Sequence, residues 1–196
     1  MKRIGIRLAA LLLAVVLACA FAACSDKKAG GLTEKERERV IELARTFRIF
    51  GEYDSEKGFE IRRYEYLVYS LASWSLGESD EVKGYGRISC EDAAALAKAA
   101  AVGVAEDSFR TKYKPNEIQV IYAIGDNYFV QLSNDKAYGF EITDVKGIPD
   151  ENGEDTMVSV TVKVTGGEAD FSIAFELVRD TESIFKVKKC EFQSTI

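Results

Sequence analysis

The fold is decided by the stretch VSVTVKVTGGEADFSIAFEL, which covers residues 158–177. Apolar and polar residues alternate through its first eight residues and again through its last seven. Because successive side chains of a strand point to opposite faces, this pattern predicts two half-buried strands. Gly166 and Gly167 predict a turn between them, so the strands should form a hairpin whose two apolar faces meet the same core.

Four more runs of strand-forming residues lie on both sides of this hairpin. They cover residues 118–124, 128–132, 137–146 and 184–192. The first run has an apolar residue at every second position from Ile118 to Ile124, which predicts one buried face. Turn signals separate the runs, and Asn152-Gly153 is the strongest of them. The second half of the chain therefore predicts an antiparallel meander of five to six strands.

Three helical segments precede the meander. Residues 33–36, Thr-Glu-Lys-Glu, form a capping box that predicts the start of the first helix. Residues 58–76 carry a broad apolar stripe at helical spacing and predict the second helix. Ser89 is a natural N-cap for the third, which contains eight alanines between residues 93 and 105. Its apolar stripe continues to Tyr113, so we expect this helix to be long.

Helices and strands are segregated along the chain, which is typical of the α+β class. We expect three N-terminal helices packed on a curved antiparallel β-meander. No internal repeat or second domain boundary follows Thr33, so residues 33–196 predict a single domain.

The element order resembles the nuclear transport factor two-like, or cystatin-like, superfamily. The resemblance rests on helices followed by a long meander, and on the closing strands around residues 175–179 and 187–189. It implies a pocket between the helices and the curved sheet, which in the isomerase members of the superfamily pairs a carboxylate with a tyrosine. The superfamily often places a short strand between its helices, and Gly86-Arg87-Ile88 is the only candidate for one here.

The first 23 residues form a targeting segment. Lys2, Arg3 and Arg7 give it a positive start, and an uninterrupted apolar run of 16 residues follows from Leu8 to Ala23. This run is shorter than the roughly 20 residues needed to span a bilayer. It is typical of a secretory signal peptide, which is removed from the mature protein.

The end of the leader resembles the lipobox of bacterial lipoproteins. Phe21-Ala22-Ala23-Cys24 has the small residues and the cysteine of that motif, although Phe21 stands where the family usually has leucine. The resemblance implies cleavage before Cys24 and attachment of a lipid to its thiol. Cys19 is the alternative, but apolar residues follow it, whereas residues 24–32 read as a polar, flexible tether. The domain is therefore expected at the cell membrane, lipid-anchored on its extracytoplasmic face.

Composition excludes several functions. The chain has no histidine, which removes Ser-His-Asp and Cys-His catalysis and His-ligated zinc or haem. Its net charge of −6 argues against a nucleic-acid partner. The acidic residues at 144 and 150–155 lack the ligand spacing of an EF-hand and read as a solvated hairpin tip. We expect no metal, no cofactor and no catalytic constellation.

Two groups of residues are candidates for a site. Cys90 and Cys190 are the remaining cysteines, and they could form a disulfide or stay as free thiols. Aromatic residues on the second helix could line a pocket or belong to the core; these are Tyr64, Tyr66, Tyr69 and Trp74.

Three functions remain open on this basis. The first is a membrane-anchored domain that binds a partner protein or a small ligand without catalysis. The second is a small isomerase- or hydratase-type enzyme with an Asp/Tyr pocket. The third is an accessory subunit of a cell-envelope complex, which would expose a large apolar patch.

Overall fold

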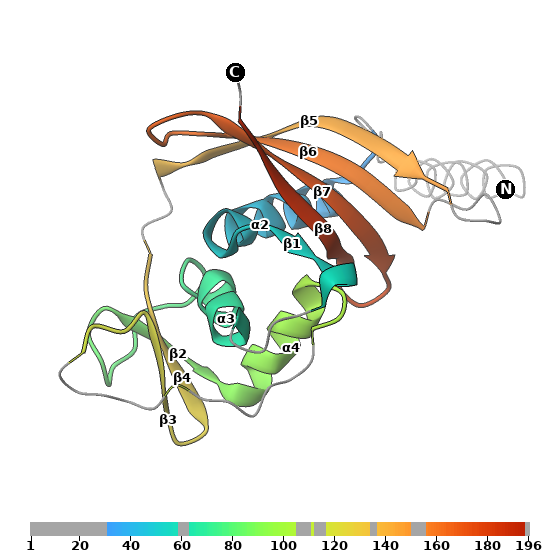
Figure 1. The fold of residues 1–196 in the computed structure, drawn as a ribbon. Coiled ribbons are helices and arrows are strands. Elements are labelled where there is room, and N and C mark those ends of the chain that lie inside the picture. The colour runs from blue at the N-terminus through green and yellow to red at the C-terminus, as the bar shows by residue number, and fades with distance from the viewer. Residues whose placement is uncertain are drawn as a thin grey trace, which may run out of the picture.

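The computed structural model describes residues 31–58, 63–104, 111, 117–133, 137–149 and 156–194 (Figure 1). The predicted signal peptide, residues 1–23 with Cys19, and the predicted lipidation site Cys24 lie outside these residues. The helices are α2 (Glu34–Phe50), α3 (Tyr64–Ala72) and α4 (Cys90–Ala100), with the short 3₁₀ helix η1 (Ser55–Lys57). Within the described residues, no helix is both long enough and apolar enough to cross a membrane.

The described strands form two antiparallel sheets. The first four are β1 (Tyr53–Asp54), β2 (Tyr85–Ser89), β3 (Ile121–Ile124) and β4 (Asn127–Gln131). The last four are β5 (Gly139–Ile148), β6 (Met157–Thr165), β7 (Phe171–Asp180) and β8 (Ile184–Ser194). The larger sheet has the order β1-β8-β7-β6-β5, and the smaller one has the order β2-β4-β3.

The α+β class is confirmed, but the expected arrangement is only partly right. β5 to β8 form the predicted meander, and β1 joins it at the edge of β8. The strands β2, β3 and β4 form a separate sheet, so the meander is not continuous. Two strands, β1 and β2, lie between helices, and the expectation that all three helices precede the sheet is wrong. Gly86-Arg87-Ile88 lies within β2.

The central hairpin has the predicted register. Val162 of β6 pairs with Ile173 of β7, and Val160 pairs with Phe175. These side chains are fully buried on the inner face of the sheet, which curves over α2 (Figure 1). Outward-facing residues of β6 stay partly exposed, so the strand alternates as expected.

The first helix begins at the predicted capping box. Thr33 accepts a hydrogen bond from the backbone N–H of Glu36 at 3.3 Å, and Glu36 Oε2 accepts one from the N–H of Thr33 at 2.7 Å. Glu36 also forms an ion pair with Arg179 of β7. Burial alone would raise the pKa of Glu36, but the bonds from Thr33 and the charge of Arg179 outweigh it and lower that pKa. The box therefore ties the start of α2 to the sheet.

The other two helices are shorter than predicted. α3 starts at Tyr64 and ends at Ala72, inside the predicted range 58–76, of which residues 59–62 lie outside the described part. α4 has the expected N-cap, Ser89, but ends at Ala100 instead of continuing through the alanine run. Residue 113, to which the stripe extended, lies outside the described residues.

A tertiary contact explains where α4 ends. Ala101 is extended and forms a parallel bridge with Val187 of β8. The next N–H, of Val102, donates to the carbonyl of Val187 at 2.9 Å. Pairing with the large sheet therefore replaces the helical hydrogen bonds that alanine would otherwise favour.

The sequence predicted the wrong core-facing side for the small sheet. The opposite side packs against the main core. Ile121 and Val130 pair across β3 and β4 and belong to the main core. Tyr122 and Phe129 lie on the other face, where their rings stack at 5.5 Å. Ile118 is 95% exposed, so the stripe from Ile118 to Ile124 is not a core face.

Candidate functional site

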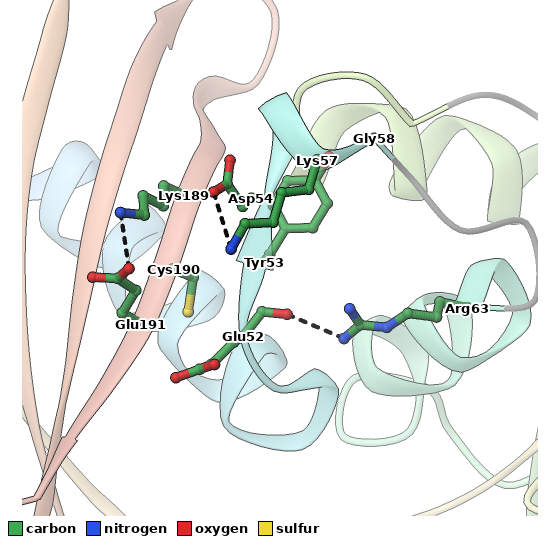
Figure 2. A pocket seen from close by; sticks show the side chains of 9 residues that line it. All are labelled: Glu52, Tyr53, Asp54, Lys57, Gly58, Arg63, Lys189, Cys190 and Glu191. Atoms are coloured by element: carbon green, nitrogen blue, oxygen red, sulfur yellow. Dashed lines mark hydrogen bonds and ion pairs between the residues drawn. The ribbon is translucent and has the colours of Figure 1, made fainter.

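A pocket of about 340 Å³ opens where β1 and η1 meet β8. Figure 2 shows charged side chains of both signs around it. It is lined by Glu52, Tyr53, Asp54, Lys57, Gly58, Arg63, Lys189, Cys190 and Glu191. Its volume lies at the lower end of the range typical of small-molecule sites, roughly 300–1,000 Å³.

The floor of the pocket is built by a cross-strand pair, Tyr53 and Cys190. Tyr53 packs against Phe47, and its hydroxyl donates to the carbonyl of Val102. Burial raises the pKa of Tyr53. Cys190 is fully buried, and burial together with the nearby charges of Glu52 and Glu191 raises its thiol pKa far above the ordinary value. Both shifts favour the protonated form, and burial does not activate Cys190 as a nucleophile.

Two of the three cations that line the pocket, Arg63 and Lys57, differ in how firmly they are held. Arg63 Nη2 donates to the carbonyls of Phe50 and Glu52, at 3.1 and 3.2 Å, and its guanidinium lies 4.1 Å above the Phe50 ring. Lys57 Nζ lies 3.6 Å from Asp54 Oδ2, a long ion pair on an exposed side chain. Lys57 is therefore the cation that can reorient most easily toward a bound anion.

Two of the lining carboxylates, Glu191 and Glu52, also differ in how strongly their partners hold them. Glu191 forms an ion pair with Lys189 at 2.8 Å, and this contact raises the pKa of Lys189. Glu52 accepts a hydrogen bond from the N–H of Phe192 at 3.4 Å. That bond is at the long end of the usual range. Glu52 is therefore the carboxylate whose present partner is most easily replaced.

The four aromatic candidates of the second helix do not line this pocket. Tyr64 is buried in the core, and Tyr69 stacks on Tyr66 with ring centroids 5.8 Å apart. The hydroxyl of Tyr66 donates to the carbonyl of Ile49, and Trp74 Nε1 donates to that of Ser70, each at 3.0 Å. These residues hold α3 in place. The residues that do line the pocket are found at positions 52–58, 63 and 189–191, where the only signal in the sequence is a concentration of charged residues.

Cys90 and Cys190 are not bonded to each other in this structure. Cys90 begins α4, where its N–H donates to the carbonyl of Asp126 at 2.9 Å, whereas Cys190 lies in β8 of the large sheet. Whether the two thiols form a disulfide in the oxidised protein stays a prediction.

The described residues hold no group of three or more potential metal ligands. Asp144, which the sequence placed in an acidic hairpin tip, lies instead in β5 and pairs with Lys146 at 2.7 Å. The remaining acidic residues of that loop, 150–155, lie outside the described part of the chain.

Comparison of the chain with protein-family models, with curated proteins and with solved structures found no match. The site is therefore interpreted from its own geometry.

Proposed function

We propose that the domain is a binding module for a small zwitterionic ligand, such as an amino acid or a short peptide. The observation that carries this proposal is the pocket beside β1, which is small and carries three acidic and three basic side chains. A lining of balanced charge matches a ligand that bears both signs, because an ion of either sign alone would leave one set of charges uncompensated.

The loosely held groups define how such a ligand would bind. Its carboxylate would replace Asp54 as the partner of Lys57, and its ammonium group would replace the weak donor, the Phe192 N–H, at Glu52. Arg63, fixed by two carbonyls and a ring, would supply a positive potential without moving.

Binding is better supported than catalysis. An Asp/Tyr isomerase needs a carboxyl group with a raised pKa beside a free phenol. The phenol of Tyr53 instead donates to Val102 inside the protein. The carboxyl groups of Glu36 and Asp180 have lowered pKa values, and neither lines the pocket.

The site of action is part of the proposal. A lipid on Cys24 would hold the domain at the extracytoplasmic face of the cell membrane, where a solute from outside the cell reaches the pocket. The long helix under a curved meander is consistent with a nuclear transport factor two-like plan, which we also propose.

Isothermal titration calorimetry tests the ligand class. The probes are free amino acids and glycyl dipeptides, each compared with its N-acetyl and amide forms. Only the zwitterionic forms should bind, and Lys57→Gln and Glu52→Gln should each weaken binding about tenfold or more, as expected for a lost charged contact. Lys35→Gln and Glu168→Gln make the same charge changes at exposed positions outside the pocket and should have no effect. Equal binding of the blocked forms would contradict the proposal.

A partner protein is the second candidate. Ile118, Val120 and Ile124 are exposed along β3 and the residues just before it, and exposed apolar residues of this kind are what an envelope subunit would present to a partner. A photo-crosslinking residue at position 118 should then capture one envelope protein in cells, while the same residue at position 83 should not. Absence of any specific product at 118 would remove this candidate.

A further inference from the structure

β5 is the last strand of the five-stranded sheet, and among the described strands none pairs with its outer edge. It is ten residues long. An edge of this length presents a row of backbone donors and acceptors that another strand can pair with.

A bulge gives this edge an unusual symmetry. Four residues of β5 pair with the inward-facing valines of β6 and so face inward; they are Phe140, Ile142, Val145 and Gly147. Without a bulge, residues 142 and 145 would lie on opposite faces, because faces alternate with a period of two. The register shifts at Thr143, between residues 142 and 144, and brings them onto one face. The inward set is therefore symmetric about the midpoint between residues 143 and 144.

The outward-facing residues follow the same symmetry, with opposite charges. Glu141 and Lys146 are equally distant from the midpoint, and both face outward. If a second β5 lies antiparallel across a twofold axis at this midpoint, Glu141 of each copy is opposite Lys146 of the other. Ile142 is then opposite Val145 on the inner face, while Asp144, which pairs with Lys146 of its own chain, is opposite Thr143.

We propose that this chain forms a homodimer by antiparallel pairing of two β5 edges about that axis, which joins the two sheets into one. The interface is isologous, so each favourable pair occurs twice. Bulges and charges usually protect an edge from indiscriminate pairing. Here they select one register, because a slip by two residues would place Glu141 opposite Asp144 of the other copy.

A groove of about 690 Å³ lies beneath this edge, between α2 and β5. Its lining is mostly charged, and Ile41, Phe140 and Ile142 are its apolar part. The interface proposed at β5 lies apart from the proposed ligand pocket, which is at the β1 edge of the same sheet.

Sedimentation of the full chain in density-matched detergent tests the dimer. The wild-type chain should sediment as a dimer, and Glu141→Lys or Lys146→Glu should each weaken dimerisation about tenfold or more, because two attractive pairs become repulsive. The double variant E141K/K146E restores opposite charges across the axis and should restore the dimer. Glu168→Lys, the same change in the exposed turn between β6 and β7, should leave it intact.

Thermal unfolding of each variant shows that the subunit still folds. A monomeric wild type, a dimer that the single variants leave unchanged, or a double variant no better than the single ones would each overturn the proposal. Recovery of a monomer with an extended segment of another protein bound to β5 would overturn it as well.

Discussion

Replacement of Val162 by aspartate tests the packing of the large sheet. Val162 is fully buried and lies between Ile142 and Ile173 on the face that covers α2. Loss of its apolar burial costs about 1.5–3 kcal/mol. Burial of a polar group without a partner costs roughly a further 2–7 kcal/mol. The total approaches the 5–15 kcal/mol that typically stabilise a whole domain, so Val162→Asp should leave the domain unfolded or close to unfolding.

Urea denaturation followed by the fluorescence of Trp74, the single tryptophan, measures this loss. Lys163→Asp is the matched control, because Lys163 points outward and its ion pair with Asp170, at 3.2 Å, is half exposed. Loss of such a pair costs less than about 1 kcal/mol. The Val162→Asp protein should also regain some stability when the pH falls from 7 to 5, since a buried carboxyl group binds a proton readily. Equal effects of the two substitutions would refute the assignment of one buried and one solvated face.

The remaining predictions concern a turn, a titration and the anchor. Gly166 has a φ of +97°, and a Cβ there would lie 2.1 Å from the carbonyl oxygen of Ala137, so Gly166→Ala should lower the melting temperature by several degrees. The lowered pKa of Glu36 means that its contribution to stability is complete above the ordinary glutamate pKa and disappears as the pH falls through the folded-state value; the deficit of Glu36→Gln in urea titrations should therefore be largest at pH 7 and shrink below about pH 4. Cys24→Ser should release the domain from membranes or leave an uncleaved precursor, as followed by fractionation and acyl labelling; retained acylation in this variant, together with its loss in Cys19→Ser, would move the anchor to Cys19.

The parts of the fold that depend on local chemistry could be predicted from the sequence. The capping box marks the start of α2 because its hydrogen bonds join residues only three positions apart. The alternation in β6 and β7 predicts their inner faces because one side of each strand is buried under a single sheet. In both cases the residues that decide the structure are neighbours in the chain.

The parts of the fold that depend on contacts between residues far apart in the chain could not be predicted from the sequence. β1 has only two residues and exists because Tyr53 pairs with Cys190. A strand this short has no sequence pattern that would predict it. The end of α4 is set by the bridge from Ala101 to Val187, against the helix propensity of the alanines. The small sheet buries residues on both faces. The alternation from Ile118 onward therefore indicated the wrong face as the one that packs against the core.

The candidate pocket was missed for a related reason. Its charges come from residues 52–57, from Arg63 and from residues 189–191, which lie far apart in the chain and carry no motif. The aromatic stripe of α3 was more conspicuous. However, large side chains at helical spacing more often mark the buried face of a helix than a ligand site. These charged residues surround one cavity only because β1 pairs with β8, and that pairing cannot be read from the sequence.

The position of β8 determines when the chain can fold. This strand pairs with β7 on one side, and on the other it pairs with β1 and bridges Ala101. Segments from the first half of the domain therefore pair with a strand that is synthesised long after them, and such long-range pairing is slow. β1 and the extended residue Ala101 can take these positions only once β8 has been made. If residues 1–23 direct export, as the sequence predicts, this delay favours translocation of an unfolded chain, and the large sheet is completed only after the chain has crossed.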